Sequence, residues 1–430
     1  MTSSETTSRE MTSYQPANQA FVWVWLPEAT EPVVCGRLDN DNGELLFTYG
    51  RSYLERGNAM ALHPALANDI GLALSDQTQR PPPGLDAHGS IRDAAPDAWG
   101  MRVNARRLAG IGADTNALPL LSHLLAAGSN RIGALHVQSS PTEFTPLQTS
   151  GTLEELAEAS ERIAANEPLT PELDAALNHA SSVGGARPKA TMTDAATGVQ
   201  HIVKFSVSND VFPWIEAEAV GMEIARRCGV ETARSTLSHA AGRAALIVDR
   251  FDRPPGGTRR HTLSALTLVG LNELVAHRSS YLDLVTLIRQ QFTDPDQTLE
   301  ELFTRIAVNI VVGNTDDHLR NHAAFWDGHR LSLTPAYDVC PQPRDHGEAS
   351  QALPYGPNGL AAARLGSLHT AAHHYRLSPT AASAIIERCS AVAGEQLHDI
   401  CAAIGVSERT HETLAGRSVN NRSIHYPHEQ

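Results

Sequence analysis

The sequence predicts an α+β fold with a β-containing N-terminal part and a mainly helical C-terminal part. Short apolar segments typical of β-strands occur within the first 50 residues and again between residues 189 and 248. From Leu263 onward, apolar residues recur mainly at helical spacing. With 430 residues, of which 41% are hydrophobic and 19% charged, the chain can bury a large core and form two or three domains.

The N-terminal elements follow from local patterns. Residues 21–26 have the composition of a strand, and residues 35–49 predict a hairpin that turns at Asn42 and Gly43. Helical spacing and the preceding breaker residues predict helices at residues 101–109, 117–127 and 153–165.

The sequence pattern changes near residue 181, where helical spacing gives way to a loop and strand-like segments. A glycine-containing loop at residues 181–189 precedes a predicted hairpin, which turns at residues 195–198 and returns through residues 199–205. A helix is predicted at residues 214–228, and a strand at residues 244–248. These elements indicate a second sheet with at least one helix beside it.

The predicted elements divide the chain into four parts. Residues 1–19 are polar and rich in Ser and Thr, and we expect a disordered tail. Residues 20–150 form a β-containing subdomain, residues 151–253 a unit with the glycine loop and second sheet, and residues 254–430 a helical unit.

Charge and composition exclude several classes of protein. The net charge of −14 would repel nucleic-acid phosphates, so direct binding to DNA is not expected. The longest apolar runs are too short to span a bilayer, and we expect a cytoplasmic protein without a membrane contact. The five cysteines lack the spacing of a zinc site or a disulfide framework.

Lysine is almost absent from the sequence. Only Lys189 and Lys204 occur, so 32 of the 34 basic residues are arginine. Genome composition explains such a bias at most surface positions, but a site that needs a compact ammonium would resist replacement by the planar guanidinium group. The two lysines are therefore candidates for such sites.

The polar segment 313–322 directly follows an apolar helix at residues 302–311. Within it, Asp316 and Asn321 have the D-x-x-x-x-N spacing of a kinase catalytic loop. A predicted hairpin at residues 322–334 then leads to Asp338, which has the position of a second metal-binding carboxylate. Phosphoryl transfer needs these groups because Mg²⁺ binds hard oxygen ligands while the nucleophile is aligned.

Lys204 lies on a predicted strand from which it can reach nucleotide phosphates, and the next helix offers Glu216 or Glu218 to orient it. We favour Glu218. At Gly184 and Gly185 backbone N–H groups can approach phosphate oxygens without a Cβ in the way, and Lys189 adds a point charge. The backbone of residues 249–251 is expected to meet the adenine.

Each candidate residue also has a simpler interpretation. Asp316 and Asn321 alone could form a helix N-cap cluster. The presence of Lys204 and Asp338 at the positions of a kinase site disfavours this interpretation. His318 and His322 are four residues apart and could mimic a zinc pair, but no third ligand is evident. Ser182 lies in the glycine-containing loop, and its residue type alone is typical of a turn-forming serine.

Together these residues resemble the HipA-type serine/threonine protein kinases, the toxins of HipA/HipB toxin–antitoxin pairs. The resemblance is carried by residues 182–189, Lys204, residues 249–252, residues 313–321 and Asp338, and by residues 47–49, 96–100 and 131–135 of the N-terminal part. It implies a bilobal kinase-like fold, with residues 151–253 as the N-lobe and residues 254–430 as the C-lobe. The residues after Asp338 are Val-Cys-Pro rather than Phe-Gly.

The resemblance also implies roles. Asp316 would be the catalytic base, Asn321 and Asp338 would bind Mg²⁺, and Glu218 would orient Lys204. Ser182 would be the autophosphorylated residue that switches the enzyme off. The residues implied in ATP binding are Gly184, Gly185, Ala186, Arg187, Lys189, Lys204, Asp249, Arg250, Phe251, Asp252, His318 and Asn321.

The implied partners are a HipB-like helix-turn-helix antitoxin, through which DNA would be contacted only indirectly, and a protein substrate of translation such as an aminoacyl-tRNA synthetase. Two other functions stay open. A catalytically silent corepressor would suit an acidic surface and a basic DNA-binding partner. A small-molecule kinase would share the chemistry and differ in the acceptor.

Overall fold

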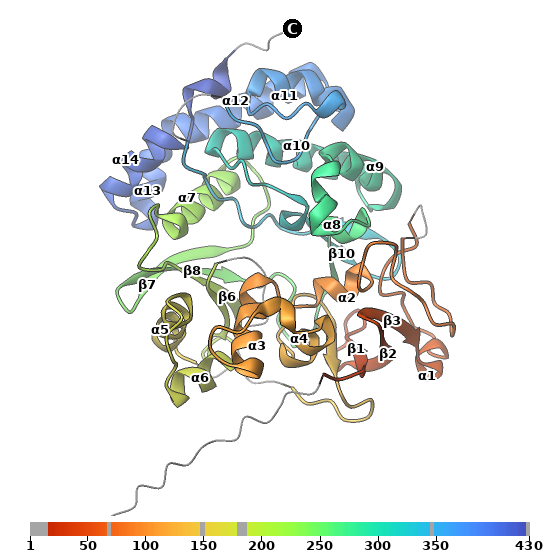
Figure 1. The fold of residues 1–430 in the computed structure, drawn as a ribbon. Helices are drawn as coiled ribbons and strands as arrows, with labels where there is room; N and C mark the ends of the chain where they lie inside the picture. Colours follow the sequence, from red (N-terminus) through yellow and green to blue (C-terminus); the bar gives the residue numbers. More distant parts are fainter. Residues whose placement is uncertain (1–15, 67–69, 147–150, 179–186, 345–347, 427–430) are drawn as a thin grey trace, which may run out of the picture.

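A computed structural model describes residues 16–66, 70–146, 151–178, 187–344 and 348–426. Three antiparallel sheets and the helices between them form two halves (Figure 1). One half contains the first two sheets and the helices up to α6, and the other contains α7 to α14 with the small third sheet. The α+β prediction is confirmed, whereas the division at residues 150 and 253 stays a prediction.

The first sheet has the strand order β3-β2-β1-β4. Its strands are β1 (Gln19–Val24), β2 (Val33–Asp41), β3 (Glu44–Tyr49) and β4 (Leu135–Gln138). The predicted hairpin is confirmed, and Asn42 and Gly43 turn it with φ angles of 53° and 96°, as two-residue hairpin loops require. β1 begins one residue inside the predicted tail, of which residues 1–15 lie outside the described part.

Helices cover this sheet and continue toward the second one. They are α1 (Arg51–Leu54), α2 (Gly89–Asp93), α3 (Ala98–Ala109), η2 (Thr115–Ala117), α4 (Leu120–Ala126), α5 (Leu153–Ala164) and α6 (Pro171–Asn178). The three predicted helices are found as α3, α4 and α5 with shifted ends. The sequence patterns did not predict α6.

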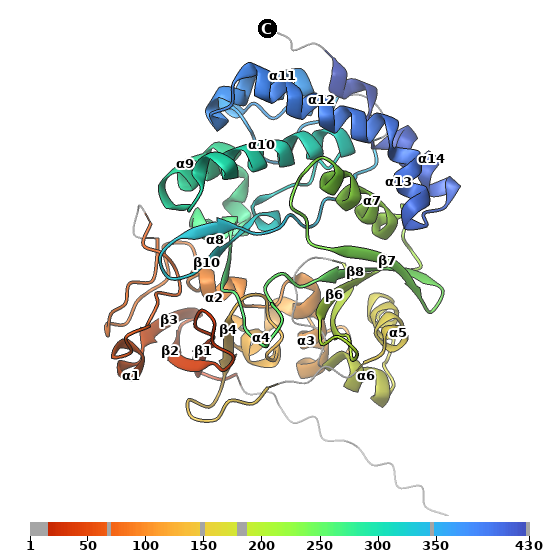
Figure 2. The ribbon, with the colours of Figure 1, turned by 180° about the vertical axis from the view of Figure 1, so that it is seen from behind.

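The second sheet has the order β5-β6-β8-β7. Its strands are β5 (Lys189–Thr193), β6 (Gln200–Phe205), β7 (Ser235–Ala240) and β8 (Arg243–Asp249), and the predicted hairpin is β5–β6. Helix α7 (Trp214–Arg227) lies between this sheet and the C-terminal helices (Figure 2). It therefore stands at the boundary between the two halves.

The third sheet, with the order β11-β10-β9, combines β9 (Thr262–Ser264), β10 (Ala323–Trp326) and β11 (Leu331–Leu333). The hairpin β10–β11 was predicted, and β9 was not. The helices of this half are α8 (Ala265–Leu268), η3 (Glu273–Arg278), α9 (Tyr281–Gln291), α10 (Pro295–Val312), η4 (Leu319–Asn321), η5 (Pro357–Gly359), α11 (Leu365–Ala371), η6 (Ala372–Tyr375), α12 (Pro379–Glu395), α13 (Leu397–Ile404), α14 (Glu408–Arg417) and η7 (Arg422–His425).

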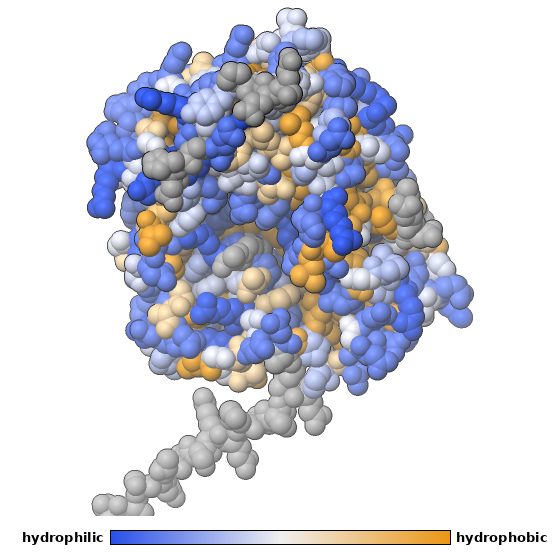
Figure 3. All heavy atoms as spheres, turned by 45° about the horizontal axis from the view of Figure 1, so that its top comes forward, coloured by the Kyte–Doolittle hydropathy of each residue, from blue (hydrophilic) through white to orange (hydrophobic). Residues whose placement is uncertain are grey.

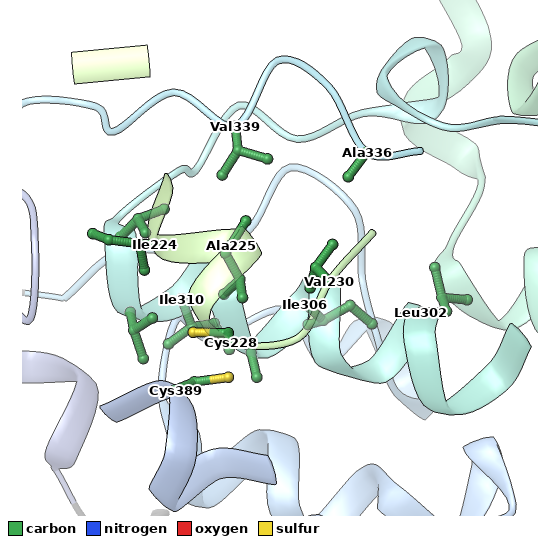
Figure 4. Packing of buried hydrophobic residues seen from close by; sticks show 14 of the residues in the cluster. Ile224, Ala225, Cys228, Val230, Leu302, Ile306, Ile310, Ala336, Val339 and Cys389 are labelled. Atoms are coloured by element: carbon green, nitrogen blue, oxygen red, sulfur yellow. The ribbon is translucent and has the colours of Figure 1, made fainter. Parts of the chain in front are cut away.

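The core of the C-terminal half lies between α7, α10 and α12 (Figure 4). Cys228 of α7 faces Ile310 of α10, with Cys389 of α12 below them and Val339 on the opposite side of α7. Within the described part of the chain, no helix is long and apolar enough to cross a membrane.

Candidate active site

Lys204 joins the two halves of the molecule. It lies on β6, and its ammonium donates hydrogen bonds to Glu218 of α7, at 2.6 Å, and to Asp338 in the loop after β11. Glu218, which the family resemblance favoured over Glu216, is therefore the helix carboxylate that Lys204 contacts. In the space-filling view of Figure 3 the surface is hollowed between the two halves.

The opposite charges in this cluster stabilise one another's ionised forms and shift their pKa values. Burial alone would lower the pKa of the Lys204 ammonium, but Asp338 and Glu218 outweigh burial and raise that pKa. Burial would raise the pKa of the Asp338 carboxyl, yet Lys204 and Lys189 lower it to about 2. Burial raises the pKa of Glu218. The Asp338 side chain is 41% exposed against 8% for Glu218, so Asp338 is the carboxylate that a ligand can reach.

Local backbone geometry places Asp338 beside Glu218. Asp338 has a φ of 62°, a left-handed conformation that aspartate tolerates better than most residues. Gly221 lies one turn after Glu218 on α7, and a Cβ there would stand 2.1 Å from the carbonyl oxygen of Val339. The missing side chain lets the segment of Asp338 approach the helix.

The segment after α10 separates two adjacent aspartates. α10 ends at Gly313 in the left-handed conformation (φ 77°). Asp316 is exposed. Asp317 is buried, accepts a hydrogen bond from the Tyr281 hydroxyl, and lies 2.8 Å from Nε2 of His322. Asp316 is thus accessible from solvent, whereas Asp317 fixes the loop. No sequence pattern indicates a role for Tyr281.

Asn321 lies near the segment of Asp338. It is 8% exposed, and a small cavity of about 10 Å³ is lined by Asn321 together with Tyr337 and Val339, the two neighbours of Asp338. Nδ1 of His318 is buried and has no hydrogen-bond partner in the described part of the chain. Among the described residues no group of three or more His, Cys, Asp or Glu side chains is placed to hold a metal ion.

Lys189 lies beside Lys204, because the two residues are register partners in the β5–β6 ladder. Its ammonium is 3.8 Å from the carboxylate of Asp97, and the Trp99 indole donates a 3.0 Å hydrogen bond to its carbonyl oxygen. The residue thus belongs to β5 and not to the preceding loop. The sequence had signalled residues 96–100 only through the family resemblance and had given Asp97 no role.

The predicted phosphate loop is described only from Arg187 onward. Ser182, Gly184, Gly185 and Ala186 lie outside the described residues. Arg187 is described, and its guanidinium forms a two-pronged ion pair with Asp210 at 3.1 and 2.7 Å. The Arg187 side chain is therefore paired with Asp210, which lies shortly before the start of α7.

In the segment predicted to meet the adenine, the side chains of Arg250 and Asp252 face the N-terminal half. Asp252 is 1% exposed and accepts hydrogen bonds from Arg250, Arg253 and the Gly133 N–H. Arg250 also donates to the carbonyl oxygens of Asn130 and Arg131. The side chains of Arg250 and Asp252 thus clamp residues 130–133, and a role of these two residues in ATP binding stays a prediction. A backbone contact with adenine stays a prediction.

The other two residues of the segment 249–252 make different contacts. Phe251 packs against Phe325 and Tyr337, each with ring centroids 5.7 Å apart. Because Tyr337 precedes Asp338, this contact ties the strand to the carboxylate loop. The Asp249 carboxylate is 3.0 Å from Nδ1 of His201.

The fold and the paired lysine–carboxylate cluster define a protein of kinase-like architecture. The model of the HipA-like C-terminal domain family matches residues 181–397, just over half of the chain. The chain belongs to this family.

Two relatives extend the comparison. A solved HipA from Shewanella oneidensis, in complex with HipB and operator DNA, matches with a TM-score of 0.62 and 17% identity, over 89% of this chain and 92% of that one. This likeness shows that the fold is shared. A curated protein of Sinorhizobium fredii named "Putative kinase Y4mE" is 28% identical over 148 residues, which are 32% of this chain. The match spans 35% of that relative's length.

Proposed function

We propose that this protein is a kinase that uses Mg²⁺ to transfer the γ-phosphoryl group of ATP to a serine or threonine hydroxyl of a protein. The observation that carries the proposal is the Lys204 ammonium held between Glu218 and Asp338, 14 and 134 residues away in the sequence. A lysine fixed by a helix carboxylate beside a metal-binding aspartate is the arrangement that kinases use to bind nucleotide phosphates.

The donor groups fit a magnesium nucleotide. Asp338 is ionised and partly exposed, and Asn321 offers a second oxygen from the neighbouring loop. Mg²⁺ prefers one or two such protein oxygens and completes its shell with water and phosphate. When bound, the ion would neutralise the charge that develops on the phosphates. Lys204 and Lys189 would bind the phosphate oxygens, and His318 would lie near them.

Asp316 would orient the acceptor hydroxyl and take its proton. Its exposed carboxylate can be reached by a protein side chain, whereas the buried Asp317 cannot. Positioning of this kind supplies most of the catalysis in phosphoryl transfer, since the protein forms no covalent bond itself.

Transfer of label from γ-labelled ATP tests this function. With Mg²⁺, the purified wild-type protein should label itself or proteins of a cell lysate, and Asp338→Ala should label neither. If the wild-type protein binds no nucleotide and transfers no label, the proposal is wrong.

A second test concerns the shape of the cation. Lys204→Arg keeps the positive charge but replaces a compact ammonium by a planar fork, which cannot take the same place between Glu218 and Asp338. We expect phosphoryl transfer to fall about 10²-fold with little change in folding, measured as initial rates and thermal unfolding. Wild-type rates in this variant would contradict the assignment.

Regulation and partners form the finer part of the proposal. We propose that a HipB-like antitoxin binds the protein, as HipB binds the structurally similar HipA, and that autophosphorylation of Ser182 switches it off. The substrate whose phosphorylation inhibits growth would be a cytoplasmic protein of translation, such as an aminoacyl-tRNA synthetase. Phosphopeptide mass spectrometry after brief expression would identify both Ser182 phosphorylation and the substrate, and expression of Asp338→Ala should no longer arrest growth.

A further inference from the structure

The start of α3 reaches into the lysine cluster from the N-terminal half of the molecule. Asp97 is the N-cap of this helix, and its Oδ1 accepts a 3.1 Å hydrogen bond from the Gly100 N–H, which fixes the carboxylate in place. Its Oδ2 is buried, has no hydrogen-bond partner in the described part of the chain, and lies 3.8 Å from the Lys189 ammonium. Two residues later, Trp99 binds the carbonyl oxygen of Lys189.

Lys189 needs such a neighbour. It is 3% exposed, and both burial and the adjacent Lys204 ammonium lower its pKa, while the charges of Asp97, Asp338 and Glu218 oppose that shift. Glu218 and Asp338 form hydrogen bonds with Lys204. Asp97 has the largest influence among the three carboxylates that favour the charged form of Lys189.

We propose that Asp97 is a positioning residue of the nucleotide site, which keeps the Lys189 ammonium charged and directed beside Lys204 to receive phosphate oxygens. The inference rests on the proposed nucleotide site and adds a residue from outside the part of the chain that matches the family. It also gives the N-terminal half a direct influence on phosphate binding.

The same contact explains how the influence would depend on pH. Burial raises the pKa of the Asp97 carboxyl to about 6, although Lys189 and then the Gly100 N–H and Arg320 oppose this. Lys189 from β5 and Arg320 from η4 are the charged groups that act on Asp97. Above pH 6 the carboxylate is ionised and supports Lys189, and below pH 6 it is neutral and the support is lost.

Nucleotide binding measured by calorimetry tests the proposal in the full-length protein. The probes are a non-hydrolysable ATP analogue with Mg²⁺, and adenosine, which lacks phosphates. At pH 8, Asp97→Asn should weaken analogue binding about tenfold and change adenosine binding less than about twofold. Asparagine can still accept the hydrogen bond from Gly100, so the helix cap is kept.

Two comparisons separate positioning from a structural role. In a Lys189→Met background, Asp97→Asn should change analogue binding less than about twofold, because its target is gone. At pH 5.5 most of the Asp97 carboxyl is neutral, and the difference in analogue binding between wild type and Asp97→Asn should shrink to about threefold. Asp93→Asn is the matched control, since Asp93 accepts hydrogen bonds from Ser264 and is not one of the three carboxylates named above that act on the pKa of Lys189.

The outcomes distinguish this inference from the proposed function. If the wild-type protein binds neither probe, the nucleotide site itself is wrong. If it binds the analogue but Asp97→Asn binds equally well at pH 8, or loses as much affinity in the Lys189→Met background, the role of Asp97 is wrong.

Discussion

Replacing Asp316 by asparagine is expected to lower the rate of phosphoryl transfer by about 10²- to 10⁴-fold, the usual contribution of a general base. The asparagine cannot take the proton of the acceptor hydroxyl. Because Asp316 is exposed, the fold should not change. Initial rates of label transfer and the thermal unfolding midpoint, measured on the same preparation, check both parts.

The neighbouring aspartate is the control. Asp317→Ala would leave the buried Tyr281 hydroxyl and the His322 ring without their acceptor, so we expect a loss of about 1–3 kcal/mol in the free energy of unfolding. The two adjacent variants should therefore differ in stability, which Asp316→Asn keeps and Asp317→Ala loses. An Asp316→Asn protein that retains wild-type rates would exclude this residue as the base.

Replacing Asp252 by alanine should lower the free energy of unfolding by about 3–5 kcal/mol, the size measured when one partner of a buried ion pair is removed. Arg250 and Arg253, whose side chains are 0% and 5% exposed, would lose their common counter-charge. The Gly133 N–H would lose its acceptor as well. Urea unfolding measures the change.

The pH dependence of stability follows from the same carboxyl. Burial alone would raise the pKa of Asp252, but Arg250, Arg253 and the Gly133 N–H lower it to about 2 in the folded protein. A lowered folded pKa stabilises the fold above the unfolded value near 4 and loses that stabilisation as the pH falls toward 2. The wild-type advantage over Asp252→Ala should shrink over this range.

Asp249→Ala provides the comparison for Asp252→Ala. Its side chain is 36% exposed and lies beside His201, so we expect less than about 1 kcal/mol. Equal losses for the two variants would contradict the clamp, because they would show that burial and the arginine pair contribute nothing special at Asp252.

Local patterns predicted much of the fold. The Asn42-Gly43 turn and the β5–β6 hairpin depend on residues close together in the sequence, so turn chemistry and alternation suffice. The short strand β9 was missed because it is formed by pairing with β10, about 60 residues later. The sequence contains no local signal for such a pairing.

The candidate site was predicted only in part, because several of its contacts join residues far apart in the sequence. Glu218 was favoured from a resemblance and a helix, and the structure places it on Lys204. The contact between Asp97 and Lys189 joins residues 92 positions apart and has no sequence pattern. The resemblance assigned Arg250 and Asp252 to ATP binding, and only the folded chain shows that the backbone carbonyls of residues 130 and 131 accept hydrogen bonds from the Arg250 guanidinium group.

The clamp around Asp252 limits how this protein could be divided. Arg250 and Asp252 lie inside the segment that matches the family, but their partners at residues 130–133 lie outside it. A fragment cut at residue 181 would expose two guanidinium groups and an acid to water in place of those partners. Fragments meant for biochemical work should therefore retain residues 130–133 together with the segment that matches the family.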